Sequence, residues 1–186
     1  MNLIETFQNL VAQVPELVQP LVVALAGAVP FIEGEGAATI GILGGIHPII
    51  AAVAAITGNF LCVLVLVMLA AQARAAVVNR RRARVLVAAD GSEITDGDAD
   101  GIRIDADDSA RKAARKQKFT RALERYGVPG VSLLGPLLLP TMFTATMLIA
   151  VGVRTARVLV WQAVAIVGWT TALTLLASGI VRFATA

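Results

Sequence analysis

The sequence has no positive charge in its first third and almost no sulfur or imidazole chemistry. Residues 1–73 contain no lysine or arginine, and the whole chain of 186 residues has one cysteine, Cys62, and one histidine, His47. A single cysteine excludes a disulfide framework or a thiolate metal site within one chain. Without lysine or arginine, the N-terminal region also lacks the basic segment that begins a cleavable signal peptide.

Apolar residues are abundant by contrast. They make up 57% of the chain, and the mean hydropathy is +0.77. They fall into two blocks, roughly 17–73 and 127–181, with a charged stretch between them. This composition lies far outside the range of soluble domains and predicts an integral membrane protein.

The distribution of basic residues predicts the topology. Of the 16 lysines and arginines, 13 lie in residues 74–125, and the other three are Arg154, Arg157 and Arg182. The positive-inside rule therefore places the central loop in the cytoplasm and the chain in the cytoplasmic membrane as a multi-pass protein. A nucleic-acid partner is not expected, because these charges lie between membrane segments and lack interleaved aromatic residues.

Only two segments, Ile49–Ala73 and Val158–Val181, have the roughly 20 apolar residues that cross a bilayer. The other apolar sequence forms four shorter limbs: Leu17–Val29, Gly36–Ile46, Gly130–Leu139 and Thr141–Val153. The limbs meet in pairs at breaks that contain Pro30, Gly34 and Gly36 in the first case and Pro140 in the second. Two limbs too short to span, joined at such a break, predict a re-entrant hairpin whose tip is buried in protein or lines a wet cavity.

The two halves can be laid over each other at a constant offset of 110 residues. Pro30 then falls on Pro140, and Gly58 falls on Gly168. Each half reads as an interfacial helix, a re-entrant hairpin and a spanning helix. The first interfacial helix has an apolar stripe from Leu3 to Val14, and the second, basic one runs from about Ser109 to Tyr126 and is closed by Gly127.

The predicted fold class is therefore all-α, an integral membrane protein built as an inverted repeat of these three elements. We expect residues 1–73 to form the first membrane repeat. Residues 74–108 would form the cytoplasmic basic and acidic loop, and residues 109–186 the second membrane repeat. The antiparallel order of the repeats is typical of transporters whose broken helices form a site near the midplane.

The first tip carries the most informative polar residues, Glu33 and Glu35, on what we expect to be a loop. Carboxylates removed from water bind protons more readily, and two close together titrate as a coupled pair. Intramembrane ionisable groups usually mark a path for ions or substrate. The alternative is a tip that reaches the opposite headgroups, where both acids are hydrated.

Three further polar residues could join a substrate or proton site: Asn59, Thr141 and Thr144. The threonine hydroxyls and the end of the second-tip helix could face the first tip. Alternatively, the hydroxyls bond to their own helix backbone, and Asn59 forms only a hydrogen bond between helices. Trp161 and Trp169 read as lipid-facing or packing aromatics.

Two stretches resemble a known superfamily. The first half contains AVPFIEGEGAATIGILGGIHP followed by a long helix with an internal glycine, and the second half contains ERYGVPGVSLLGPLLLPTMFTATMLIAVGV. These resemble the two halves of the DedA/VTT superfamily, and more closely the bacterial small multidrug export family. The resemblance implies a bacterial two-hairpin transporter, lipid scramblase or flippase, with Glu33 and Glu35 at the positions of the first-tip acids. The arginines that flank the second-tip proline in DedA proteins are replaced by apolar residues around Leu137 and Phe143.

The charged loop contains TDGDADGIRIDAD, in which acidic residues match part of a calcium-binding loop: Asp96, Asp98, Asp100 and Asp107. Arg103 stands where such loops have an aliphatic residue, and the last ligand would be Asp instead of Glu. A solvated turn is favoured, with residues 84–87 and 102–104 as strands of a small hairpin. No other metal site and no cofactor is expected.

We therefore expect a proton-coupled transporter that moves a lipid or a small amphipathic molecule, in contact with membrane lipids and as a homo-oligomer, most simply a dimer. One alternative is a four-helix antiporter that exchanges cationic drugs for protons. Another is a membrane scaffold whose basic loop binds lipid heads or a protein partner. An enzyme is not expected, because the sequence shows no nucleophile with a base and no metal cluster.

Overall fold

The described part of the chain consists of helices joined by short turns and contains no strand. The computed structural model describes residues 3–89, 106–137 and 139–185. Its elements in chain order are α1 (Leu3–Gln13), α2 (Gln19–Gly27), α3 (Glu33–Leu43), α4 (Pro48–Ala89), α5 (Ala106–Leu134), the 3-10 helix η1 (Gly135–Leu137), α6 (Thr141–Ala150) and α7 (Thr155–Thr185). The all-α class predicted from the sequence is confirmed.

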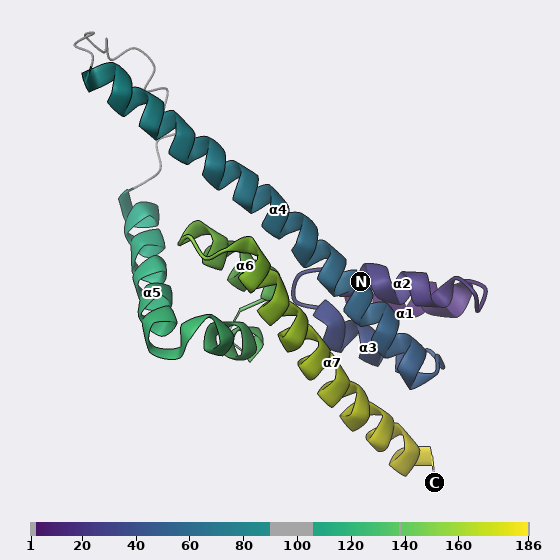
Figure 1. The fold of residues 1–186 in the computed structure, drawn as a ribbon. Helices are drawn as coiled ribbons and strands as arrows, with labels where there is room; N and C mark the ends of the chain where they lie inside the picture. The colour runs from purple at the N-terminus through teal and green to yellow at the C-terminus, as the bar shows by residue number, and fades with distance from the viewer. Residues whose placement is uncertain (1–2, 90–105, 138, 186) are drawn as a thin grey trace.

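The two longest helices, α4 and α7, form the frame of the molecule. They pack against each other and run in opposite directions along the diagonal of Figure 1. Within the described residues, they alone are long and apolar enough to cross a membrane, over Pro48–Arg80 and Thr155–Val181. These are the two segments predicted to span.

Helix α4 continues past the predicted end of its apolar segment. It runs without interruption to Ala89, so the first part of the expected loop is helical. The expected strand at residues 84–87 is wrong. Alanine and arginine on both sides of these valines are strong helix formers, and an existing helix extends more readily than a new strand pair begins.

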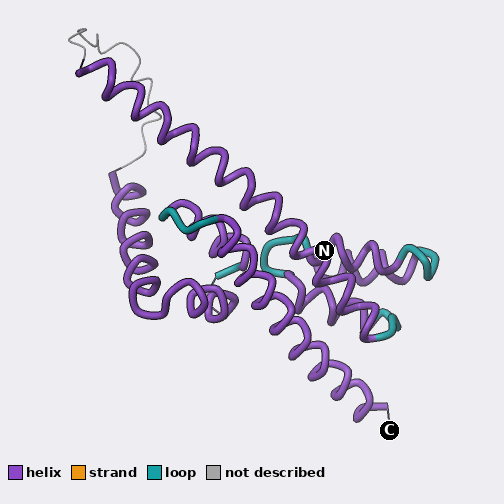
Figure 2. Tube along the Cα trace, in the orientation of Figure 1, coloured by secondary structure: helices purple, strands orange, loops and turns teal. Residues whose placement is uncertain are grey.

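The first hairpin consists of α2 and α3, which pack against each other and against the N-terminal half of α4. In Figure 2 the loop between them lies near the centre of the molecule, and their other ends lie near the start of α4. Helix α1 covers this hairpin through its apolar stripe, with Val11 completely buried. A side chain on Gly58 would overlap the backbone of Ala24, so this glycine permits close packing of α2 on α4.

The second hairpin is formed by the C-terminal arm of α5, η1 and α6. Helix α5 bends at Gly127, whose φ of 66° and ψ of −177° are not helical. The bend lies where the sequence predicted that the basic helix ends. Pro140 precedes α6 in an extended conformation, and the tip at this proline faces the tip of the first hairpin (Figures 1 and 2).

The core is divided into two apolar clusters. One joins the first hairpin, α1 and the start of α4, and the other joins α5, α6, the middle of α4 and the start of α7. Along α4, Ala55 belongs to the first cluster and Val63 to the second, and the buried residue between them on the same face is Asn59. On α7 the buried threonines Thr170 and Thr174 follow the last residue of the second cluster. A layer of polar side chains therefore separates the two clusters at the level where the tips meet.

Candidate functional site

The two tips are joined by a carboxylate. Glu33, the first residue of α3, accepts a hydrogen bond from the backbone N–H of Thr141 and a second, of 2.8 Å, from the Thr141 hydroxyl, both on the same oxygen. Glu33 is 5% exposed and Thr141 is 1% exposed. Thr141 is the first residue of α6, where backbone N–H groups lack partners within the helix. The carboxylate therefore also lies at the positive end of the α6 dipole.

The backbone of the first tip is held in an uncommon conformation. Phe31 and Glu33 have φ angles of 71° and 54°, a region that residues other than glycine rarely adopt. Such conformations persist where the surrounding structure imposes them, and they concentrate at functional sites. The two left-handed residues turn the chain sharply, so that α3 begins at Glu33 with its carboxylate directed at the second tip.

This arrangement corrects one expectation. Glu33 and Glu35 lie in the first turn of α3 and not on a loop before it. Gly34, between them, allows α3 to approach α7, because a side chain there would collide with the hydroxyl of Thr170. The glycine-rich sequence therefore serves close packing of a helix, where the sequence suggested only a break.

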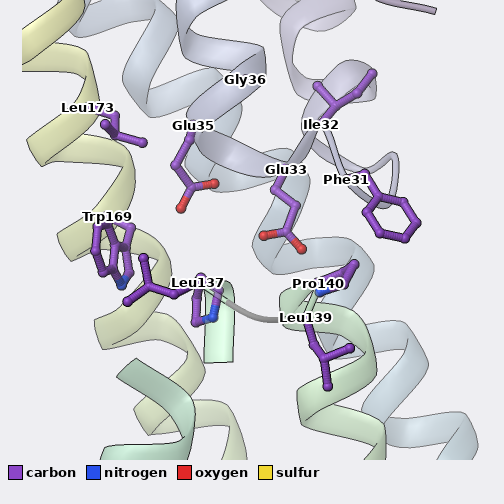
Figure 3. Close-up of a pocket in the computed structure, with 11 residues that line it drawn as sticks. Phe31, Ile32, Glu33, Glu35, Gly36, Leu137, Leu139, Pro140, Trp169 and Leu173 are labelled. Atoms are coloured by element: carbon purple, nitrogen blue, oxygen red, sulfur yellow. The ribbon is translucent and has the colours of Figure 1, made fainter. Parts of the chain in front are cut away.

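Glu35 and Glu33 both border a cavity of about 410 Å³ (Figure 3). Their carboxylates point to the same side, toward Pro140, Leu137 and Trp169. Glu35 is only half-buried. The cavity thus has one carboxylate engaged with the second tip and a second that is more accessible.

Trp169 on α7 forms one wall of this cavity. Its indole N–H donates a hydrogen bond of 2.8 Å to the carbonyl of Leu133 in α5, which ties α7 to the second hairpin. Apart from the two acids, the lining is apolar or glycine: Phe31, Ile32, Gly36, Pro136, Leu137, Leu139, Pro140, Trp169 and Leu173. A small set of polar groups in a mainly apolar cavity is the usual composition of a site for an amphipathic ligand.

A second cavity of about 400 Å³ adjoins the first. The two share Phe31, Ile32, Glu35, Gly36 and Leu173 in their linings. From Glu35 the second cavity extends between α1, α3 and α7 as far as Ile4 and Ile180, and its lining contains no other charged residue. Glu35 therefore lies where the cavity that contains Glu33 meets a second cavity with no other charged residue.

The tips also touch through two aromatic rings. The ring centres of Phe31 and Phe143 are 6.4 Å apart, with an angle of 53° between the ring planes. Aromatic pairs prefer such tilted arrangements. The contact between the hairpins is therefore polar at Glu33 and Thr141 and apolar beside them.

The remaining predicted site residues are buried but not at Glu33. Asn59 is 0% exposed, and its backbone N lies 3.4 Å from the Cβ that Gly27 would carry, so its backbone lies against α2. Thr144 is 1% exposed and lies against Gly135. Neither the Asn59 amide nor the Thr144 hydroxyl has a hydrogen-bond partner among the described residues. Of the three polar candidates, the structure brings Thr141 alone into contact with the glutamate.

The four predicted tip residues have distinct environments. Pro30 is exposed on the loop between α2 and α3, Gly34 is buried against α7, and Gly36 lines the cavity. Pro140 is buried and precedes α6 directly. All four lie at or beside the meeting point of the hairpins.

The calcium candidates are mostly not described. Asp96, Asp98 and Asp100 lie outside the described residues, and Asp107 falls in the first turn of α5. Within the described part of the chain, no group of three or more histidine, cysteine, aspartate or glutamate side chains could hold a metal ion.

Three residues of this region were not among the predicted site residues. Trp169 lines the cavity, Thr170 contacts Gly34, and Gln162 is 0% exposed without a hydrogen-bond partner among the described residues. A signal was present, because Gln162, Thr170 and Thr174 recur at spacings of eight and four and so mark one polar face of α7.

Comparisons with protein-family models, with curated proteins and with solved structures found no match to this chain.

Proposed function

We propose that this protein is a proton-coupled membrane transporter that moves a lipid or a small amphipathic molecule. One observation carries the proposal: a buried carboxylate, Glu33, links the tips of two short helical hairpins beside a largely apolar cavity. Ionisable groups in such a place are costly and usually serve an ion or substrate path. The resemblance to small multidrug export and DedA proteins implies the same architecture and the same acidic tip.

The exposure of the long helices supports a location in the bilayer. Only 28% and 22% of the most apolar stretches of α4 and α7 are buried inside the chain. The core helix of a soluble protein would bury most of its apolar surface. Exposed side chains such as Val53, Leu69 and Leu175 would instead contact lipid or a second copy of the chain.

The contacts between the tips support the inverted repeat. At the offset of 110 residues, Glu33 corresponds to Phe143 and Thr141 corresponds to Phe31. The offset therefore maps the pair Glu33–Thr141 onto the pair Phe143–Phe31. The residues of each pair are in contact. Reciprocal contacts of this kind are expected between two units related by a two-fold axis.

The geometry suggests how a proton would be coupled to movement. As a carboxylate, Glu33 accepts both bonds from Thr141 and interacts favourably with the N-terminus of α6. A proton on Glu33 removes its charge and weakens both interactions, because bonds to an ionised acceptor are the stronger ones. The hairpins would then separate more easily and open the cavity. Binding of a substrate beside Glu35 would be favoured in that state.

The test uses the full chain in liposomes, with transbilayer movement of a fluorescent lipid measured with and without a pH gradient. Glu33→Gln keeps the size of the side chain and removes its titration, so it should abolish the dependence on the gradient. Glu16→Gln is the control, because Glu16 is an exposed glutamate before α2 that lines neither cavity at the tips. Unchanged gradient dependence in Glu33→Gln would overturn the assignment of Glu33.

A second candidate function is the export of cationic amphipathic molecules in exchange for protons. It is favoured by the lining of the two adjoining cavities, which contains two carboxylates, two aromatic side chains and no lysine or arginine. Such a lining suits a cation through charge and through the faces of the rings. Gradient-dependent efflux of a cationic dye from the same liposomes, with no lipid movement, would favour this function over the first.

A further inference from the structure

A separate cavity lies at the other end of the second hairpin. It has a volume of about 410 Å³ and is formed between α4 and the turn that joins α6 to α7. Arg74 and Asn79 line it from α4, and Gly152, Arg154 and Thr155 line it from the turn and the start of α7. The rest of its lining is aliphatic: Ala71, Ala75, Val78, Ile149 and Val153. Basic and aliphatic groups thus share one groove, which is distinct from the cavities at the tips.

Arg74 is held against the turn. A side chain on Gly152 would place its Cβ 2.8 Å from the Nη2 atom of Arg74, so the guanidinium group lies directly over this glycine. Gly152 also has a φ of 100°, which strongly favours glycine. Glycine at position 152 is therefore favoured for two reasons: the backbone conformation of the turn, and the space that the guanidinium group of Arg74 occupies. Arg74 comes from the other half of the chain.

Three sources of positive potential converge on the groove. Arg74 and Arg154 both line it, and neither forms an ion pair with a residue that the structure describes. The third is the N-terminus of α7, which begins at Thr155 and presents unpaired backbone N–H groups. The lining contains no acidic residue. Guanidinium groups and helix N-termini are the groups that proteins use to hold phosphate.

We propose that this groove binds the headgroup of an anionic phospholipid. The arginines and the α7 N-terminus would hold the phosphate, and the aliphatic residues would contact the glycerol and the first carbons of the acyl chains. Charge complementarity favours a phosphate, and the aliphatic share of the lining favours a lipid over a free anion. The site goes beyond the proposed transport function and depends only on the location of the chain in a membrane, with the basic end of α4 at the anionic leaflet.

The experiment counts lipids that remain bound to the purified full chain in detergent, by native mass spectrometry. Phosphatidylglycerol is titrated against phosphatidylcholine. We expect the wild-type chain to retain phosphatidylglycerol preferentially. Arg74→Gln and Arg154→Gln should each weaken that retention about fivefold, and the double variant about thirtyfold.

Arg157→Gln is the matched control. Arg157 lies in the first turn of α7, three residues after Arg154, and is also exposed, but it does not line the groove. Its removal subtracts the same charge and should change retention by less than about twofold. A loss equal to that of Arg154→Gln would show attraction by general surface charge and would overturn the proposal.

Two further outcomes would also overturn it. Unchanged retention in the double variant would exclude the groove as the site. Displacement of phosphatidylglycerol by inorganic phosphate at the same concentration would identify a site for a free anion. Because Arg74 and not Arg154 lies against Gly152, the Arg154→Gln variant reports on binding even where Arg74→Gln disturbs the turn.

Discussion

The two hairpin tips have similar architecture and opposite chemistry. The first tip supplies the acceptor, Glu33, from a strained left-handed backbone, and the second supplies two donors from Thr141 at the start of a regular helix. At the positions equivalent under the 110-residue offset, the same contact is made by Phe143 and Phe31. The hairpins are therefore in contact through both pairs, but only the pair that contains Glu33 can bind a proton.

The difference extends to the two glycines of the long helices, Gly58 and Gly168, which also correspond under the 110-residue offset. Gly58 on α4 lies so close to α2 that a side chain would overlap the Ala24 backbone, whereas nothing lies within 4 Å of the Cβ that Gly168 on α7 would carry. Gly58 therefore lets the first hairpin pack closely on α4, whereas Gly168 is exposed on α7 and has no neighbour that a side chain would meet.

The largest expected effect tests the difference between Gly58 and Gly168. Gly58→Ala should lower the free energy of unfolding by about 3 kcal/mol, because the colliding atoms are backbone and cannot rotate away. Gly168→Ala should raise it by up to about 1 kcal/mol, since alanine is the better helix former and meets no neighbour. Unfolding in mixed micelles, followed by tryptophan fluorescence, measures both. Equal effects of the two substitutions would contradict the difference.

The next effect concerns the approach of the first tip to α7. Gly34→Ala should cost about 2 kcal/mol, because its new methyl group meets the Thr170 hydroxyl. Adding Thr170→Ala removes that oxygen and should recover most of the loss. Adding Thr170→Val, which leaves a methyl group in its place, should recover none. Independent, additive effects in both double variants would show that Gly34 and Thr170 do not touch.

An effect of similar size separates two threonines one turn apart on α6. Thr141→Val removes a hydrogen bond to Glu33 and should lower the free energy of unfolding by about 2 kcal/mol. Thr144→Val replaces a buried hydroxyl that has no partner among the described residues, so it should be neutral or slightly stabilising. The same unfolding measurement compares them. A larger loss in Thr144→Val would show that its hydroxyl is bound, for example through water.

Most of the helices could be predicted from the sequence, but the contacts between them could not. Proline and glycine breaks between limbs too short to span predicted both hairpins, because length and local backbone geometry are properties of the chain alone. The extension of α4 to Ala89 was missed, because the valines at residues 85 and 87 have strand propensity and their helical context is set by what precedes them.

The residues of the candidate site could likewise be predicted only where their contacts with other helices did not matter. Glu33 stood out because a carboxylate is costly in an apolar stretch, wherever it points. Thr141 and Thr144 could not be distinguished, since the face that α6 turns toward the first tip depends on tertiary packing. The sequence alone indicates only a lipid-facing or packing aromatic at Trp169. In the structure Trp169 lines the cavity and donates a hydrogen bond to Leu133, and no local sequence pattern predicts that contact.

The smallest expected effect concerns the contact between the rings of Phe31 and Phe143. Phe31 is 81% exposed and Phe143 is 48% exposed, so little area is buried between the rings. A double-mutant cycle of Phe31→Ala and Phe143→Ala should therefore give a coupling of about 0.5 kcal/mol, at the low end for aromatic pairs. The cycle of Glu33→Gln and Thr141→Val should give a larger coupling, because its bond is buried and charge-assisted. If the tips separate when Glu33 is protonated, the aromatic coupling should also fall in the Glu33→Gln background. An aromatic coupling that is unchanged there would mean that the rings hold the tips together without the carboxylate, and that protonation of Glu33 does not open the contact.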